Sequence, residues 1–385
     1  MASIGEIGGS KGHLVMPEGY FPGMRTLITV RQPGNEPLPL VVEDGQFTDP
    51  DDGPIDEELN TDGFHALPGL ADCHAHLGYN SMGEMLDIDE EGVRANAARN
   101  AWAQVEGGVL LIADKGSGTD VTLEILEAPP TERPQAKMAG QIIAPPGGYY
   151  QGYGNEVDEA GLVDAVRAAD ARSSWVKIIG DWPRKGEGPL ANYSTAALVK
   201  AVAVAHAAGR KVAIHIMAPA GVRPAVDSGV DSIEHGTFLD GDDLSALAET
   251  GGAWVPTVRN TEVIMEFLGA DSSGRRLLGD GLANLRELLP EAERLGVTVL
   301  AGTDLSVPHG DIAEEAITLH EYGLSAHAAV TAVSTAAYDY LEVDRRLALG
   351  AQANVVFFAD DPRDRIETLR TPQLIIRAGR ALRPV

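Results

Sequence analysis

The segment LPGLADCHAHL, residues 67–77, decides the predicted fold of this chain. A Pro-Gly turn leads into a short apolar run that carries Asp72, His74 and His76 at a spacing of two. In a β-strand this spacing puts the three side chains on one face. Two imidazoles at the end of a buried strand can bind a divalent metal through their ring nitrogens. A His-x-His pair alone is a weak signal, so a metal site requires further ligands elsewhere in the chain.

Four later apolar runs each carry one further candidate ligand. Each run is short, rich in β-branched residues and followed by Gly, Pro or a polar loop, which is typical of a buried strand. The candidates are Lys177 in SWVKIIGD, His215 in KVAIHIM, His235 in DSIEHGT and Asp304 in TVLAGTDL. The complete set therefore combines four histidines, one lysine and one aspartate.

From residue 67 onward, strand-like runs alternate with Ala-rich helical patterns, which predicts a parallel sheet with crossover helices. Eight strand candidates can be counted: LPGLADCHAH, GVLLIADKG, KMAGQIIAP, SWVKIIGD, KVAIHIM, DSIEHGT, AWVPTV and VTVLAGTDL. Eight such units over roughly 240 residues match the length of a (β/α)8 TIM barrel. A doubly wound open sheet is the alternative, but only a closed ring brings these strand ends to a common centre. We predict the barrel over residues 67–345.

The two ends of the chain follow a different pattern. TLITV and PLVVEDGQF precede the barrel as candidate strands separated by Gly, Pro, Asn and Asp. ANVVFFADDP and LIIRAGRAL follow it as candidates for a small sheet. We therefore expect residues 1–66 and 346–385 to meet in one accessory β domain beside the barrel.

The composition bounds the class of protein and its partners. The chain has 385 residues, 44% hydrophobic and 23% charged, which is ordinary for a globular protein with a large core. A net charge of -27 argues against binding to nucleic acid or to anionic membranes. Cys73 is the one cysteine, so no disulfide can form within the chain, which fits a reducing cytoplasm. Because no signal-peptide or membrane-spanning pattern is found, we expect a cytoplasmic protein. We expect its partner to be a small-molecule substrate. The protein could also assemble into a homo-oligomer.

The chemistry of the candidates suggests two metals. The C-terminal ends of barrel strands form the functional rim. The donors divide into His74, His76 and Asp304 for one metal, and His215 with His235 for a second. An anionic group must then bridge the two cations, and Lys177 can do so after adding carbon dioxide to become a carbamate. Asp72, in phase with the two histidines of the first strand, is better suited to supporting that strand than to binding metal.

In order along the chain, these motifs resemble the metal-dependent amidohydrolase superfamily, and more narrowly its prolidase-like and imidazolonepropionase-like branch. The resemblance rests on PGLADCHAH, VKI, VAIH, GVDSIEHGT and AGTD followed by PHG. It implies two zinc ions, a carboxylated Lys177, a metal-bridging hydroxide, and Asp304 as proton shuttle. The implied reaction is cleavage of a C–N amide bond in a small molecule such as a dipeptide or an N-acyl amino acid.

Residues of the predicted rim loops are candidates for contact with the substrate: Tyr149, Tyr153, Trp182, Arg259 and His309. Aromatic rings can pack around a substrate, and a guanidinium can bind a carboxylate. Two departures from the family pattern leave the substrate open. Tyr149 stands where relatives commonly show His, and Ile216 to Ala218 stand where relatives often have Ala-His-Gly.

Three other functions compete with a binuclear amidohydrolase. Without carboxylation, a single metal on His74, His76, His215 and Asp304 would suit hydrolysis of cyclic amides or deamination of heterocycles. The same hydroxide could attack lactones or phosphotriesters. A binding protein with a structural metal is the alternative outside enzymes.

Overall fold

The structure is a computed structural model that describes residues 23–32, 34–184 and 186–382. The first 22 residues of the predicted N-terminal β segment and the last three of the chain lie outside the described residues. No helix in the described ranges combines the length and the apolar character that crossing a membrane requires.

Eight parallel strands occupy the eight segments that the sequence predicts as strands. Three form one sheet in the order β6 (Leu70–Ala75), β7 (Val109–Asp114) and β8 (Gln135–Met138). Five continue in a second sheet in the order β11 (Trp175–Ile179), β14 (Lys211–Ile216), β15 (Ser232–His235), β16 (Ala253–Val255) and β17 (Thr298–Val299). The short strands β9 (Ile143–Ala144) and β10 (Asn155–Glu156) precede β11 at the edge of this second sheet.

Hydrogen bonds join the two parallel sheets at both ends. A parallel bridge pairs Ala139, just after β8, with Trp175 of β11. At the other junction, Cys73 N donates to Ala301 O at 2.8 Å and Asp304 N donates to His74 O at 2.7 Å. The arrangement is therefore TIM-barrel-like, with the first and last strands in contact.

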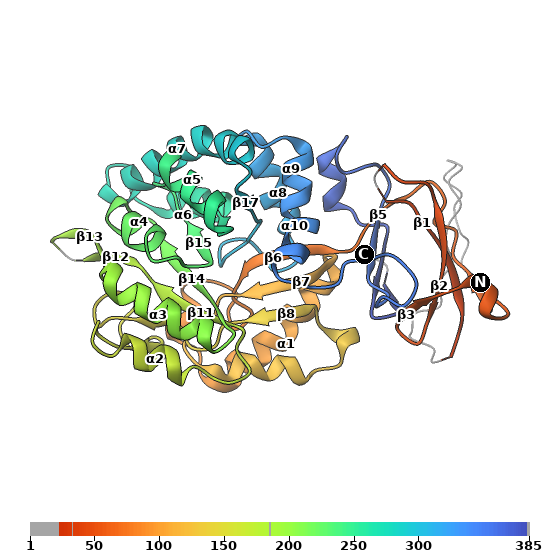
Figure 1. Ribbon diagram of the computed structural model, residues 1–385, viewed down its shortest axis with the longest axis horizontal. Coiled ribbons are helices and arrows are strands. Elements are labelled where there is room, and N and C mark those ends of the chain that lie inside the picture. Colours follow the sequence, from red (N-terminus) through yellow and green to blue (C-terminus); the bar gives the residue numbers. More distant parts are fainter. Residues whose placement is uncertain (1–22, 33, 185, 383–385) are drawn as a thin grey trace, which may run out of the picture.

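Helices lie around these strands (Figure 1). They are α1 (Glu90–Glu106), α2 (Leu162–Ala168), α3 (Thr195–Ala207), α4 (Pro219–Val226), α5 (Gly241–Thr250), α6 (Val258–Phe267), α7 (Ser273–Leu295), α8 (Ile312–Glu321), α9 (Ala326–Ala332) and α10 (Thr335–Tyr340). The ends of α5 illustrate how the sequence sets their limits. Asp240 and Asp243 form a capping box at its start, and Gly251 ends it with φ 72, in the left-handed region that glycine adopts readily.

Shorter elements fill the connections. The loop after β11 folds into a hairpin of β12 (Asp181–Arg184) and β13 (Gly188–Ala191). Five 3-10 helices are η1 (Pro50–Asp52), η2 (Glu84–Leu86), η3 (Asp120–Glu127), η4 (Pro130–Glu132) and η5 (Ile366–Arg370).

The chain ends form two further sheets, which lie beyond the parallel strands in Figure 1. One contains β3 (Gln46–Thr48), β2 (Leu38–Glu43), β1 (Thr26–Val30) and β4 (Glu57–Glu58). The other contains β20 (Arg380–Leu382), β19 (Leu374–Arg377), β18 (Val355–Phe358) and β5 (His65–Leu67). Side chains from both sheets share one buried apolar cluster, in which Ile28, Leu40 and Phe47 join Val355 and Phe357.

The predicted first strand is in fact two strands. Leu67 ends β5 and pairs with Val356 of β18, whereas β6 begins at Leu70. Pro68 has no N–H to continue a ladder, and Gly69 has φ 137. A Cβ at Gly69 would lie 2.6 Å from the Tyr338 hydroxyl, so the turn depends on glycine.

Glu315 connects α8 to the start of α6. Its buried carboxylate accepts hydrogen bonds from Val258 N and Arg259 N, both at 2.8 Å. These are backbone donors of the first turn of α6, which have no partner inside the helix. Burial raises the pKa of Glu315 to about 8, although the two backbone bonds oppose this shift.

We expect the stability of the protein to depend on the ionisation of Glu315. Because its pKa rises from an ordinary value of 4.5 to about 8 on folding, its contribution is complete below the unfolded pKa and is lost as the pH rises toward 8. Glu315→Gln cannot ionise, so the stability difference between the wild type and this variant should shrink between pH 5 and pH 8. Urea denaturation at the two pH values measures this difference, with Glu314→Gln as control because Glu314 instead pairs with Arg370. An equal pH dependence of the wild type and Glu315→Gln would contradict the assignment.

Candidate metal centre

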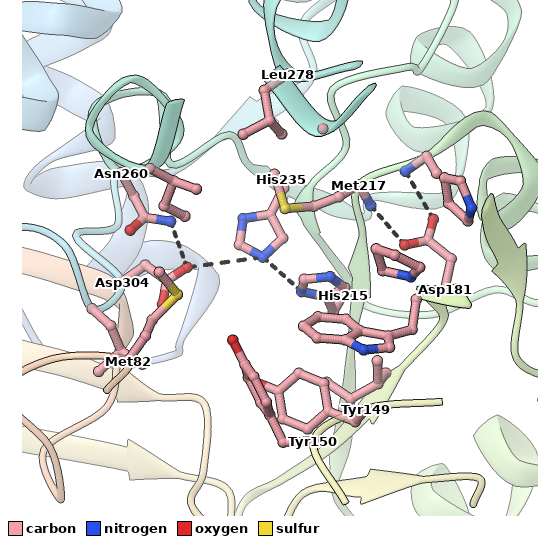
Figure 2. A pocket seen from close by; sticks show the side chains of 18 of the residues that line it. Met82, Tyr149, Tyr150, Asp181, His215, Met217, His235, Asn260, Leu278 and Asp304 are labelled. Carbon is pink, nitrogen blue, oxygen red and sulfur yellow. Dashed lines mark hydrogen bonds and ion pairs between the residues drawn. The ribbon is translucent and has the colours of Figure 1, made fainter. Parts of the chain in front are cut away.

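A cavity of about 390 Å³ lies among the ends of the parallel strands (Figure 2). Its lining includes all six residues that the sequence selects as ligands: His74, His76, Lys177, His215, His235 and Asp304. These side chains come from β6, β11, β14, β15 and the segment after β17. The fold therefore brings together residues that lie as far as 230 positions apart in the chain.

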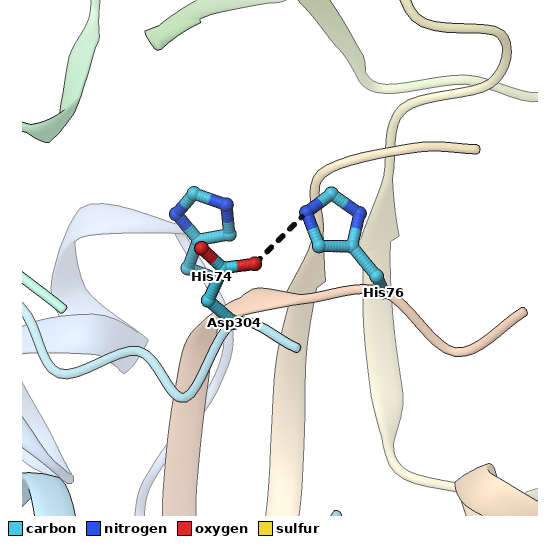
Figure 3. A group of neighbouring side chains, drawn as sticks. All are labelled: His74, His76 and Asp304. Atoms are coloured by element: carbon cyan, nitrogen blue, oxygen red, sulfur yellow. Dashed lines mark ion pairs between the residues drawn. The ribbon is translucent and has the colours of Figure 1, made fainter. Parts of the chain in front are cut away.

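His74, His76 and Asp304 form a first group of potential ligands (Figure 3). Each offers one potential ligand atom, and these atoms lie within 4.8 Å of one another. His76 Nδ1 lies 2.7 Å from Gly116 O, and His76 Nε2 lies 3.6 Å from Asp304 Oδ1. His74 Nδ1 lies 2.6 Å from Glu234 Oε2. Because Nδ1 of each ring has a partner, Nε2 is the nitrogen available to a metal, as is usual for metal-binding histidines.

His215 and His235 form a second group beside the first. His235 Nε2 lies 2.9 Å from His215 Nδ1 and 4.0 Å from Asp304 Oδ2. The Thr257 hydroxyl lies 2.6 Å from His235 Nδ1 and so orients the ring. Two imidazole nitrogens that face each other can share one proton or bind one cation, so this pair also fits a metal.

Lys177 lies on β11 and lines the same cavity. Its side chain is buried, and Nζ has no hydrogen-bond partner among the described residues. Burial lowers the pKa of Lys177 to about 8. Burial of an amine without a hydrogen-bond partner is energetically costly. The surroundings of Lys177 therefore favour a bound group that interacts with Nζ.

Burial also lowers the pKa of all four histidines. The pKa of His76 and that of His215 fall to about 3, and the Lys177 ammonium adds to the effect of burial. The pKa of His74 and that of His235 fall well below the ordinary value. The four imidazoles are therefore neutral at neutral pH, which is the form that binds metal.

Asp304 is held by Asn260 of α6. Asn260 Nδ2 donates to Asp304 Oδ2 at 2.8 Å, and Asn260 Oδ1 accepts from Ser306 N at 3.1 Å. The backbone of Asp304 has φ 55, and burial raises the pKa of its carboxyl group to about 7. Asn260 is not predicted from the sequence because it lies inside a helix and not at the end of a strand.

Asp72 connects β6 to the segment that carries Asp304. Its carboxylate accepts hydrogen bonds from Thr303 Oγ1 at 2.5 Å and from the backbone N of Thr303 and of His74, both at 3.1 Å. These contacts fix the two segments that carry His74, His76 and Asp304 relative to each other.

Two further buried charges were also missed. Glu234 contacts His74 as described, and its Oε1 lies 3.1 Å from Lys115 Nζ. Strand alternation places Glu234 on the opposite face from His235, but His235 has φ 65 and leaves the strand conformation, so alternation fails there. Lys115 could have been predicted as a residue of the site, because the apolar run LLIADKG ends in the polar residues Asp114 and Lys115.

Of the five predicted substrate contacts, Tyr149 and Trp182 line the cavity. Their ring centroids lie 4.6 Å apart, and Tyr150 packs against Trp182 at 5.2 Å. The ring of Trp182 lies 5.8 Å from that of His215, so this aromatic wall of Tyr149, Tyr150 and Trp182 borders the ligand groups.

Tyr153, Arg259 and His309 are not among the described residues that line the cavity. Tyr153 is buried and packs against Tyr149, with ring centroids 5.7 Å apart. Arg259 Nη1 bonds instead to Glu262 Oε2 at 3.0 Å. His309 Nε2 lies 2.9 Å from the carbonyl O of Tyr79.

The chain is similar to proteins of known family. A family model described as "Amidohydrolase family" matches residues 65–381. An uncharacterized protein of Mycobacterium tuberculosis is 34% identical over 340 residues, which cover 84% of this chain and 86% of that protein. An ochratoxinase of Aspergillus niger is 27% identical over 356 residues, which cover 80% of this chain and 73% of the relative.

Solved structures share the fold. A Xaa-Pro dipeptidase with bound methionine superposes with a TM-score of 0.80 at 21% identity, covering 93% of this chain and all of that one. The A. niger ochratoxinase superposes with a TM-score of 0.76 at 20% identity, covering 94% of this chain and 96% of that one.

We expect the Thr257 hydroxyl to support metal binding through His235. Thr257→Val keeps the shape of the side chain but removes the partner of Nδ1, and loss of such a partner typically lowers metal affinity by about 10–100-fold. Titration with a metal chelator measures the affinity. Thr261→Val is the matched control, because this buried hydroxyl one turn along α6 bonds to Thr257 O and not to a histidine. Equal metal affinity in the two variants would contradict the role of Thr257.

Proposed function

This chain belongs to the amidohydrolase family and is a hydrolase that acts on carbon–nitrogen bonds; on that premise we propose that it cleaves an amide bond of a small molecule with two zinc ions. The observation that carries the proposal is the single cavity lined by four neutral histidines, a lysine and an aspartate. Neutral imidazole and carboxylate are donors that suit zinc.

We assign His74, His76 and Asp304 to one zinc ion and His215 with His235 to the other. Lys177, as a carbamate, would be shared by both. When bound, the zinc ions lower the pKa of a water molecule and polarise the scissile carbonyl.

Lys177 is suited to carbamate formation. A lysine reacts with carbon dioxide through its neutral amine, and a pKa lowered to about 8 leaves an appreciable neutral fraction at neutral pH. The reaction joins the amine nitrogen to carbon dioxide and releases one proton, which gives Lys177 the negative charge that two cations require.

Asp304 is proposed as the catalytic base and acid. It takes a proton from the attacking water and passes it to the leaving nitrogen. The amide of Asn260 holds one carboxylate oxygen at 2.8 Å and so fixes the orientation of the group. Glu234 and Thr257 hold the Nδ1 atoms of His74 and His235, which directs the opposite nitrogens of these rings toward the metals.

The substrate class rests on the relatives and on the cavity. The dipeptidase and ochratoxinase names both describe hydrolases of the kind expected for this family. A volume of about 390 Å³ is within the range of pockets that bury small organic ligands.

We also infer that the two parallel sheets close into one (β/α)8 ring and that the two terminal sheets form an accessory domain, as the sequence predicts.

Replacing Lys177 should change the metal content. We expect the wild type to hold about two zinc ions per chain and Lys177→Ala to lose at least one, with a large loss of activity. Elemental analysis of the purified proteins gives the stoichiometry. Lys211→Ala is the control, because Lys211 lies at the start of the neighbouring strand β14 and outside the cavity.

Mass spectrometry or diffraction of the native protein should find an added carboxylate on Lys177 and none on Lys115, which is equally buried but already paired with Glu234. Full activity and two ions in Lys177→Ala would refute the bridging role. One ion per wild-type chain would favour a mononuclear hydrolase.

Asp304→Asn should lower kcat by about 10²–10⁴-fold, the range typical of a lost acid–base group. Steady-state kinetics on a hydrolysed amide measures kcat, and the metal content of the same sample separates lost proton transfer from lost metal. An unchanged kcat at full metal content would remove Asp304 from the mechanism.

A further inference from the structure

The cavity has a polar floor and apolar walls, and this contrast bears on the substrate if the proposed amide hydrolysis is correct. Its walls are built mainly from apolar side chains: Met82, Ile142, Ile179, Trp182, Pro183, Pro189, Met217, Ile264, Leu268, Leu277, Leu278 and Leu305. Among the described residues that line it, histidines aside, the one basic side chain is Lys177 at the floor. A substrate group away from the metals therefore meets no positive charge in this lining.

Two polar side chains of the walls, Asp181 and Asn260, are already engaged within the protein. Asp181 accepts hydrogen bonds from Met217 N at 3.0 Å and Ala218 N at 2.9 Å through its two oxygens. Asn260 is occupied by Asp304 and by Ser306 N. Among the described residues of the lining, the wall thus contributes an acidic group and no basic side chain.

Arginines that neighbour lining residues in the chain are turned to other partners. Arg259, next to Asn260, bonds to Glu262. Arg275 Nη1 donates to Met265 O at 2.5 Å and to Leu268 O at 3.3 Å. Arg184, at the end of β12, donates to Asn192 Oδ1 at 3.2 Å. Arg259 and Arg275 are therefore engaged by an acidic side chain and by backbone carbonyls, whereas Arg184 makes one hydrogen bond, to a neutral amide, and lies outside the lining of the cavity.

The aromatic wall does suit an uncharged group. Tyr149, Tyr150 and Trp182 present ring surface beside His215, which favours a planar apolar substituent. Burial raises the pKa of Tyr149 and of Tyr150, so their hydroxyls stay protonated and can donate to a neutral carbonyl.

A free carboxylate in these walls would lose its hydration without gaining an ion pair, which costs more than the burial of a neutral group. The net charge of -27 adds a long-range repulsion of anions. We propose that the site selects amides that are uncharged and apolar on both sides of the scissile bond, and discriminates against dipeptides and N-acyl amino acids with a free carboxylate.

A matched pair of substrates tests this proposal on the zinc-loaded wild type. N-benzoyl-phenylalanine and N-phenethylbenzamide differ by one carboxylate, and release of benzoate from each can be followed by chromatography. We expect kcat/KM to be roughly tenfold or more higher for the uncharged amide, since an unpaired buried charge is costly. The preference should persist in 0.5 M NaCl, because salt screens the long-range field but not the local loss of hydration.

The outcomes separate this proposal from the function on which it rests. Equal or faster hydrolysis of the free acid overturns the proposed selectivity and leaves amide hydrolysis standing. A preference that disappears in salt also overturns it, because the discrimination would then come from net charge. If neither compound nor any member of a wider amide series is hydrolysed, the proposed function fails and this inference with it.

A variant provides a second measurement. Figure 2 shows Leu278 of α7 across the cavity from Tyr149 and Tyr150. Leu278→Arg introduces a cation into the wall and should shift the ratio of kcat/KM roughly tenfold or more toward the free acid. Leu278→Met, similar in volume and uncharged, should keep the wild-type ratio. An unchanged ratio in a folded, zinc-loaded Leu278→Arg would count against a wall that selects by charge.

Discussion

The contact between the first and last parallel strands is the constraint on which the candidate centre depends. Asp304 N donates to His74 O, and the Asp72 carboxylate binds the backbone and hydroxyl of Thr303. These bonds join segments about 230 residues apart, so the geometry of the first group of ligands depends on the strand–helix units that lie between them. A local error in any unit would displace Asp304 relative to His74 and His76. This explains why the supporting bonds are buried and why several act on the same two segments.

The second constraint is electrostatic. The floor of the cavity takes four imidazoles, two lysines and two carboxylates out of water, and such groups are stable only when paired or neutral. Glu234 pairs with Lys115 on one side and with His74 on the other, while burial keeps the histidines neutral. The Lys177 amine has neither a hydrogen bond nor an ion pair in the described part of the chain, whereas His74 Nδ1 and Glu234 Oε2 at least contact each other. The proposed carbamate and metals would supply the partners that this amine lacks.

The parallel strands and the six candidate ligands that line the cavity could be predicted from the sequence, because both follow from short-range patterns. A buried parallel strand is a brief β-branched run, and its polar end points to the common rim whatever the loops do, as His76 and His235 illustrate. The same reasoning failed for Glu234, where a φ of 65 at His235 breaks the alternation, and for Asn260, whose role depends on how α6 packs against the last strand segment. The position of Tyr153, Arg259 and His309 outside the cavity lining could not be predicted either, because the direction of a rim side chain depends on its local partners. The Pro-Gly pair indicates a turn at Gly69. It does not indicate that the residues on the two sides of this turn belong to different sheets.

The division of the cavity into floor and walls separates reaction type from substrate choice. The donors of the floor lie on or directly after strands of the two parallel sheets, so their positions are set by the core of the fold. The walls come from the β12–β13 hairpin, the loop that carries Tyr149, and helices α6 and α7, which contact each other but add no ligands. Substitution there can change which molecule fits without moving a donor atom, because the aromatic rings and Leu278 do not support the histidines. The arginines beside this wall bond to backbone carbonyls and to Glu262, so a charge-binding wall would require only that one of them exchange its partner. The proposed selectivity for neutral amides thus depends on the partners of a few rim side chains, whereas the proposed metal binding depends on the parallel strands as a set.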